Sequence, residues 1–186
     1  MSCTVAEAPV RPLLDQHTIQ SRVAELGAEI SRDYKDLNPV IVAILKGSMP
    51  FFVDLSRAIH IPHTWDTLQV SSYHGGTTSS GVVKFNADLS DAIEGRHVIL
   101  VEDIVDTGRT ISYLLSSLST RNPSSIKVAS LLDKPSRREV PVPIDYLGFT
   151  IPDEFVIGYG LDYGQFFRNL PFVGVLEQVP TLPFGV

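Results

Sequence analysis

Apolar runs of strand length recur along the chain. Val40 to Leu45 and Val98 to Val101 are aliphatic and largely β-branched, which is typical of strands that are buried on both faces. Ile126 to Leu132, which also contains Lys127 and Ser130, gives a further strand of the parallel type. We expect further strands at 65–73, 146–151, 155–159 and 173–176.

Between these runs the apolar residues return every three or four positions, as on one side of a helix. One such helix follows Thr18, its expected N-cap, a second covers about Pro50 to Ile59, and a third begins near Ile111. Alternating strands and helices predict an α/β fold with a mainly parallel sheet flanked by helices. The late short strands and the N-terminal segment are expected to form a small cap.

Composition narrows the class of protein. The chain has 186 residues, a net charge of -6 and a pI near 5.3, so a general nucleic-acid binder is disfavoured. Cys3 is the only cysteine, and no apolar run is long enough to span a membrane. We expect a cytoplasmic protein with a flexible extension at 1–12 and a single domain at 13–186.

The largest group of candidate functional side chains directly follows the run at Val98 to Val101. Glu102 and Asp103 end that strand, and Asp106 precedes a loop of small and polar residues, Thr107 to Thr110, that opens a helix. Backbone N–H groups at a helix N-terminus bind phosphate, whereas carboxylates accept hydrogen bonds from sugar hydroxyls. A sugar phosphate with Mg²⁺ satisfies both groups.

This string, VEDIVDTGRTIS, resembles the phosphoribosyl-pyrophosphate signature of the type I phosphoribosyltransferases. The resemblance implies that Asp106 is the general base and that Glu102 and Asp103 bind the ribose and Mg²⁺. It implies also that the loop binds the 5′-phosphate through Thr107, Gly108, Arg109 and Thr110.

A second loop, Lys46-Gly47, follows the run at Val40 to Leu45. Lysine brings a positive charge and glycine lets the backbone approach an anion, although the same residues also suit an ordinary turn. The loop resembles the pyrophosphate loop of the purine phosphoribosyltransferases, which implies phosphoribosyl-pyrophosphate binding by both residues. In that family the bond before the lysine, here Leu45–Lys46, is often cis.

Lys134 lies just past the strand at Ile126 to Leu132, within LLDKP. That segment resembles hypoxanthine-guanine phosphoribosyltransferases of the bacterial type, where the lysine donates to the oxygen at purine position 6. An ammonium group has donors only, so it favours a 6-oxopurine over adenine.

The segment from Ile151 to Arg168 resembles the purine clamp of the same family. The resemblance implies that Phe155 stacks on the base, that Val156 binds the ring edge through its backbone, and that Arg168 reaches pyrophosphate. It assigns purine binding to Phe155, Val156, Leu161 and Asp162, with Asp162 a metal ligand as well.

Ser72-Tyr73 resembles the head of the family's closing loop, which binds phosphoribosyl pyrophosphate and excludes water during the reaction. His74 departs from the pattern, because glycine commonly stands there.

The resemblance implies transfer of the phosphoribosyl group to hypoxanthine or guanine, giving IMP or GMP and pyrophosphate, by an Mg²⁺-dependent homo-oligomer (dimer or tetramer). Two alternatives stay open. One is a regulator that binds phosphoribosyl pyrophosphate and then RNA or DNA, against which the acidic balance counts. The other is a phosphoribosyltransferase for another base, of which xanthine fits best.

Overall fold

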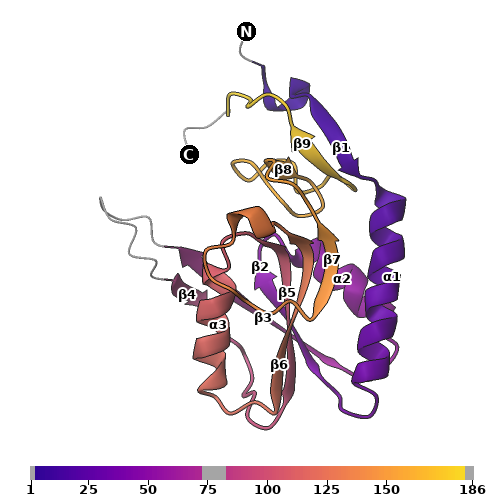
Figure 1. Cartoon of the computed structure of the whole chain (residues 1–186), viewed down its shortest axis with the longest axis vertical. Helices are drawn as coiled ribbons and strands as arrows, with labels where there is room; N and C mark the ends of the chain where they lie inside the picture. The colour runs from indigo at the N-terminus through magenta and orange to yellow at the C-terminus, as the bar shows by residue number, and fades with distance from the viewer. Residues whose placement is uncertain (1–2, 73–82, 183–186) are drawn as a thin grey trace.

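The computed structural model describes residues 3–72 and 83–182. Its larger sheet has the strand order β4-β3-β2-β5-β6-β7, in which β4 is antiparallel and the others are parallel (Figure 1). This arrangement confirms the predicted fold class. The strands are β2 (Val40–Leu45), β3 (Thr64–Ser72), β4 (Val83–Ala87), β5 (His97–Val105), β6 (Ser125–Asp133) and β7 (Tyr146–Thr150).

Helices cover both faces of this sheet: α1 (Gln16–Asp33) and α2 (Met49–Ala58) on one, α3 (Arg109–Ser119) on the other (Figure 1). Successive strand residues point to opposite faces. In β2, Ile41 therefore packs in the cluster of α1 and α2, whereas Val42 packs in the cluster of α3. Two apolar cores make the sheet a rigid support for the loops at its carboxyl edge.

A second sheet caps that edge in the order β1-β9-β8, built from β1 (Val10–Leu14), β8 (Val156–Ile157) and β9 (Val173–Leu176) (Figure 1). Short 3₁₀ turns, η1 (Val5–Glu7) and η2 (Pro135–Arg137), complete the elements. The expected cap is therefore present. The expectation of a flexible extension through residue 12 was wrong for its last residues, because Val10 to Pro12 pair with β9. That partner is too distant in sequence for a local pattern to show.

Several element ends also differ from the sequence expectations. The N-cap of α1 is Asp15, whose carboxylate accepts from the Thr18 N–H at 2.7 Å, so Thr18 lies inside the helix. Strand β5 runs on to Val105 because its later residues still pair with β6. The strand expected at 155–159 shrinks to β8, since Gly158 and Tyr159 take positive φ angles. Among the described residues no helix is long and apolar enough to cross a membrane.

Candidate active site

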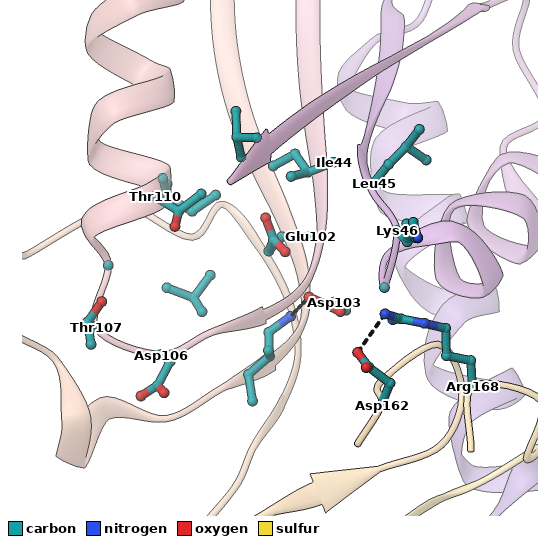
Figure 2. Close-up of a pocket in the computed structure, with 16 residues that line it drawn as sticks. Ile44, Leu45, Lys46, Glu102, Asp103, Asp106, Thr107, Thr110, Asp162 and Arg168 are labelled. Atoms are coloured by element: carbon teal, nitrogen blue, oxygen red, sulfur yellow. Dashed lines mark hydrogen bonds and ion pairs between the residues drawn. The ribbon is translucent and has the colours of Figure 1, made fainter. Parts of the chain in front are cut away.

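The predicted functional loops meet at the carboxyl ends of the parallel strands, where open α/β sheets bind their ligands. A cavity of about 310 Å³ opens there beneath the cap (Figure 2). Four stretches distant in sequence line it: the end of β2 with the turn after it, Val70 of β3, the end of β5 with the start of α3, and the loop of the cap. The predicted residues that line it are Lys46, Gly47, Glu102, Asp103, Asp106, Thr107, Gly108, Thr110, Asp162 and Arg168.

The loop before α3 has the form of an anion cradle. Gly108 is the N-cap and takes a φ of +84°, and a Cβ there would lie 2.3 Å from the carbonyl oxygen of Val140. Only glycine fits this position. Because Gly108 has no side chain to cap the helix, N–H groups in the first turn of α3 are available to a ligand, apart from that of Arg109, which donates to the Thr107 hydroxyl at 3.4 Å.

Arg109 does not follow the expectation for its side chain. Its guanidinium donates from Nε to a carboxylate oxygen of Glu139 at 2.7 Å and does not line the cavity. Glu139 is held nearby because its backbone N–H bonds the carbonyl of Thr107 at 2.9 Å. The backbone N–H of Arg109 donates to the Thr107 hydroxyl at 3.4 Å, so phosphate binding by residue 109 stays a prediction.

Glu102 and Asp103 form an acidic pair beside this loop. One carboxylate oxygen of Glu102 is buried and has no hydrogen-bond partner among the described residues. Burial, and then the neighbouring charge of Asp103, raises the pKa of Glu102 well above its ordinary value. Gly47 lets Asp103 sit close, since a Cβ at 47 would lie 1.6 Å from its carboxylate. A buried carboxylate that lacks a partner fits a bound cation.

The predicted metal set of Glu102, Asp103 and Asp162 is not assembled as one cluster. No group of three such ligands converges anywhere in the described ranges. The physical reason is that Asp162 is engaged elsewhere, by Arg168, whose Nη2 lies 2.6 Å from its Oδ1 (Figure 2). The side chains of 102 and 103 share one strand, and Asp162 belongs to the cap.

The two expected pyrophosphate-binding cations lie together. The Leu45–Lys46 peptide bond is cis, as the resemblance implied. Gln165 accepts from Lys46 Nζ at 3.4 Å and from Arg168 Nη2 at 3.2 Å. Arg168 also donates to the carbonyl of Gly160 at 2.7 Å. The glutamine, which sequence reasoning passed over, joins both cations.

A second cavity of about 450 Å³ adjoins the first and has the predicted purine-binding residues in its wall, together with Asp103, Asp106 and Asp162, which line both cavities. Phe155 is 53% exposed and meets Tyr163 edge-on, with ring centroids 5.9 Å apart. A large exposed aromatic face is what stacking on a base requires. The predicted members are Lys134, Phe155, Val156, Leu161 and Asp162.

Lys134 is almost fully buried, and its Nζ donates to the carbonyl of Glu154 at 2.5 Å. It therefore faces the loop that precedes Phe155. Ser72 ends β3, and Tyr73 lies outside the described residues.

Sequence reasoning missed two neighbours of this cavity, Arg137 and Asp153. In the structure Arg137 Nε lies 3.0 Å from an oxygen of Asp106 and Nη1 lies 3.7 Å from one of Asp153. Its position three residues after Lys134, at the carboxyl end of a strand, was the available signal.

The phosphoribosyl transferase domain model matches residues 10–164. The chain belongs to the phosphoribosyltransferase family. This phosphoribosyltransferase is 47% identical to the hypoxanthine-guanine phosphoribosyltransferase of Streptococcus pneumoniae, over 92% of its own length and 96% of that protein.

The phosphoribosyltransferase is also 46% identical to the bifunctional protein TilS/HprT of Listeria innocua, but spans only 26% of that longer protein and 89% of itself. Among solved structures, a hypoxanthine phosphoribosyltransferase from Staphylococcus aureus superposes with a TM-score of 0.86 at 44% identity. That match covers 90% of this chain and 91% of the other.

Proposed function

We propose that this phosphoribosyltransferase transfers the phosphoribosyl group from phosphoribosyl pyrophosphate to hypoxanthine or guanine, giving IMP or GMP. The bond from ribose carbon 1 to pyrophosphate breaks, and a bond from carbon 1 to purine nitrogen 9 forms. The observation that carries the proposal is the pair of adjoining cavities whose shared wall contains Asp103, Asp106 and Asp162.

The first cavity suits the phosphorylated sugar. The N–H groups at the start of α3 face the 5′-phosphate, and Lys46 and Arg168 supply positive charge for the pyrophosphate. Arginine offers fixed paired donors for such oxyanions. Charge that develops on the leaving group is thereby stabilised without reorganisation of the protein.

Mg²⁺ fits the acidic pair, and Glu102 and Asp103 would hold it together with substrate oxygens and, once released from Arg168, Asp162. When bound, the ion neutralises pyrophosphate charge and so makes pyrophosphate a better leaving group. Glu102 supports this assignment, since its buried oxygen has no protein partner in the described part of the chain.

The second cavity suits a 6-oxopurine. Phe155 would stack on the ring, and Lys134 would exchange its bond to the Glu154 carbonyl for one to the purine oxygen. Asp106 lies in the wall between the cavities and would take the proton from purine nitrogen 7. A site built to hydrogen-bond one polar group can reject an analogue lacking it by about 10⁴-fold.

The first experiment measures pyrophosphate release by the purified protein with phosphoribosyl pyrophosphate and Mg²⁺, with each base offered separately. We expect release with hypoxanthine and guanine but not with adenine or uracil. Strong release with xanthine would correct the base specificity alone. If the protein binds phosphoribosyl pyrophosphate but releases no pyrophosphate with any base, the proposal of an enzyme is wrong. The protein would then be a regulator that binds this ligand.

Asp106→Asn tests the general base. Its turnover should fall by about 10²–10⁴-fold, because positioned proton transfer typically contributes that much. The dissociation constant of phosphoribosyl pyrophosphate should change little, which isothermal titration checks. An equal loss of binding would make Asp106 a ligand for the sugar phosphate and not the base.

We propose that the enzyme works as a homo-oligomer in the cytoplasm. Its phosphorylated substrate, phosphoribosyl pyrophosphate, is made there and cannot cross a membrane. Trp65 supports the oligomer: it is 54% exposed, and its ring meets Phe52 of α2 edge-on. A large exposed aromatic side chain is typical of an interface. Sedimentation velocity of the native protein and of Trp65→Ser decides whether this face joins two copies.

A further inference from the structure

Arg137 is placed between two carboxylates at the mouth of the base cavity. From η2 its guanidinium reaches Asp106 with Nε at 3.0 Å and Asp153 with Nη1 at 3.7 Å. Lys134 Nζ lies 4.0 Å from the same oxygen of Asp153. The four side chains alternate in charge along one wall of the cavity.

The contact with Asp106 has an unusual form. The oxygen that faces Arg137 is buried and accepts no hydrogen bond from the described residues, so the guanidinium holds it by charge and proximity. Because Arg137 covers only this oxygen, the other carboxylate oxygen of Asp106, whose side chain is 40% exposed, stays available for a proton donor that enters the cavity. A tight bidentate bond would instead occupy the atoms that the reaction needs.

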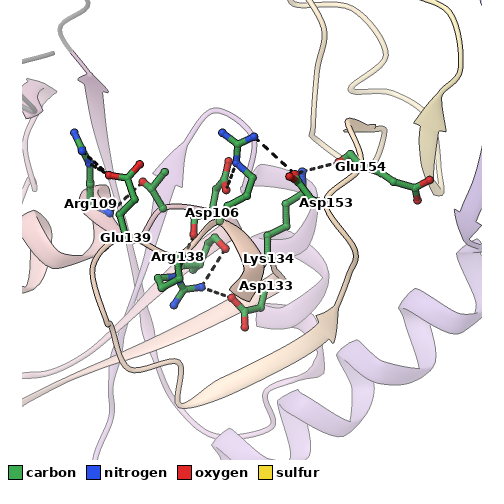
Figure 3. Close-up of polar contacts among 11 residues, drawn as sticks. Asp106, Arg109, Asp133, Lys134, Arg138, Glu139, Asp153 and Glu154 are labelled. Carbon is green, nitrogen blue, oxygen red and sulfur yellow. Dashed lines mark hydrogen bonds and ion pairs between the residues drawn. The ribbon is translucent and has the colours of Figure 1, made fainter. Parts of the chain in front are cut away.

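The neighbouring Arg138 has a different task. It donates to the backbone carbonyls of Asp106 at 3.0 Å and Val105 at 3.3 Å, and it forms an ion pair with Asp133. Arg138 therefore fixes the main chain at Asp106, while Arg137 contacts its side chain (Figure 3).

We propose that Arg137 is a positioning residue, which holds the Asp106 carboxylate at the angle from which it takes the purine proton. Asp153 anchors the other end of the guanidinium, so that Arg137 links the phosphate loop to the loop of the purine clamp. This inference rests on the proposed function of Asp106 as general base and extends it to a residue outside the substrate-binding set.

A role in stability would predict different behaviour. The side chains of Arg137, Asp106 and Asp153 are 50%, 40% and 52% exposed, and such ion pairs contribute little to folding. Misplacing a reacting group by about 1 Å can nevertheless cost about 100-fold in rate. We therefore expect loss of Arg137 to slow the chemical step without lowering the melting temperature.

The test is a double-mutant cycle on the full-length protein with Arg137→Gln, Asp106→Asn and both together, read as single-turnover rates of pyrophosphate release. Arg137→Gln alone should slow the chemical step about 10- to 100-fold, with an unchanged dissociation constant for phosphoribosyl pyrophosphate. In the Asp106→Asn background it should have no further effect. Arg32→Gln, which removes an exposed arginine that forms an ion pair with its neighbour Asp33, is the control.

Two further variants sharpen the cycle. Arg137→Lys keeps the charge but not the paired donors and should restore part of the rate. Asp153→Asn should slow the step less than Arg137→Gln does, because only the distant anchor is lost.

Each outcome decides the proposal. If Arg137→Gln lowers the single-turnover rate equally in the wild-type and the Asp106→Asn backgrounds, Arg137 acts on the substrate or on the fold, and the proposal is wrong. The proposal is also wrong if Arg137→Gln leaves the rate of the otherwise wild-type protein unchanged. An unchanged rate in Asp106→Asn would overturn the general base and with it the role of Arg137. Failure of the wild-type protein to release pyrophosphate is a separate result, which refutes the proposed function itself.

Discussion

Gly160 should be among the least replaceable residues of the cap. Its φ is +101°, and a Cβ there would lie 1.9 Å from the carbonyl oxygen of Gly47 and 2.9 Å from the ring of Pro50. Real Cβ contacts stay beyond 3.0 Å, so alanine must push the two backbones apart by about 1 Å. The segment that must yield is the Lys46-Gly47 loop.

The cost has two parts. A left-handed backbone costs a residue with a side chain about 1–2 kcal/mol, and overpacking typically adds about 1–3 kcal/mol. Gly160→Ala should therefore lower the free energy of unfolding by about 2–5 kcal/mol. Gly95 provides a matched control, because its φ is +68° and a Cβ there would meet no atom within 4 Å, so Gly95→Ala should cost only the first part.

Urea denaturation of the two variants isolates the steric part as their difference, about 1–3 kcal/mol. At this chain length the difference corresponds to roughly 2–12 °C in melting temperature. The KM for phosphoribosyl pyrophosphate should rise in Gly160→Ala alone, because only there is the pyrophosphate loop displaced. If Gly160→Ala and Gly95→Ala destabilise the protein equally, or if Gly160→Ala leaves the KM for phosphoribosyl pyrophosphate unchanged, the contact between Gly160 and the Lys46-Gly47 loop does not have the role argued for it.

The other predictions concern the core, the surface and the ligand. Leu26→Ala, at a fully buried position of α1, should cost about 3–5 kcal/mol of unfolding free energy in urea, as cavities at such positions do. The paired donors of Arg121 lower the pKa of Asp88 below its ordinary value of 3.8. The ionised carboxylate therefore stabilises the fold at pH values above 3.8. Asp88→Asn should lower the free energy of unfolding by a few tenths of a kcal/mol at pH 7. That difference should vanish as the pH falls through the lowered pKa, which melting curves across pH 2–6 would check. Phosphoribosyl pyrophosphate with Mg²⁺ at about 100 times its Kd should add about 2.7 kcal/mol of stability, measured by calorimetry, and EDTA or the double variant Glu102→Gln, Asp103→Asn should abolish most of it.

The parts of the fold that the sequence predicts are those whose cause is local. The run at Val40 to Leu45 is apolar at every position because both faces of β2 are covered, and its composition alone identifies a buried strand. Strand β4 also has a local signal, because Val83 to Ala87 alternate strictly between apolar and polar residues, but the pattern does not show that the strand pairs antiparallel with β3 at the sheet edge. Strand β1 likewise depends on a partner at the far end of the chain.

The candidate site divides in the same way. Residues that belong to one continuous motif, such as Thr107 and Gly108, could be assigned because the loop and helix that place them are contiguous. The ion pair of Arg137 with Asp106 could not be foreseen, since it forms only when η2 folds back over the phosphate loop. The contact of Arg109 with Glu139 was hidden for the related reason that Glu139 approaches from that returning segment.

The pairing of β1 with β9 sets an order of events when the protein is synthesised. Val10 can find its partner Leu176 only after almost the whole chain has left the ribosome, and the Leu176 N–H in turn bonds the carbonyl of Phe155 at 3.2 Å. The strands that carry the phosphate loop are complete once β6 has been made, whereas the purine clamp waits for the last strand. The nascent protein therefore acquires the 5′-phosphate loop well before the cap supplies Arg168 and the purine clamp, and β1 stays unpaired throughout that interval.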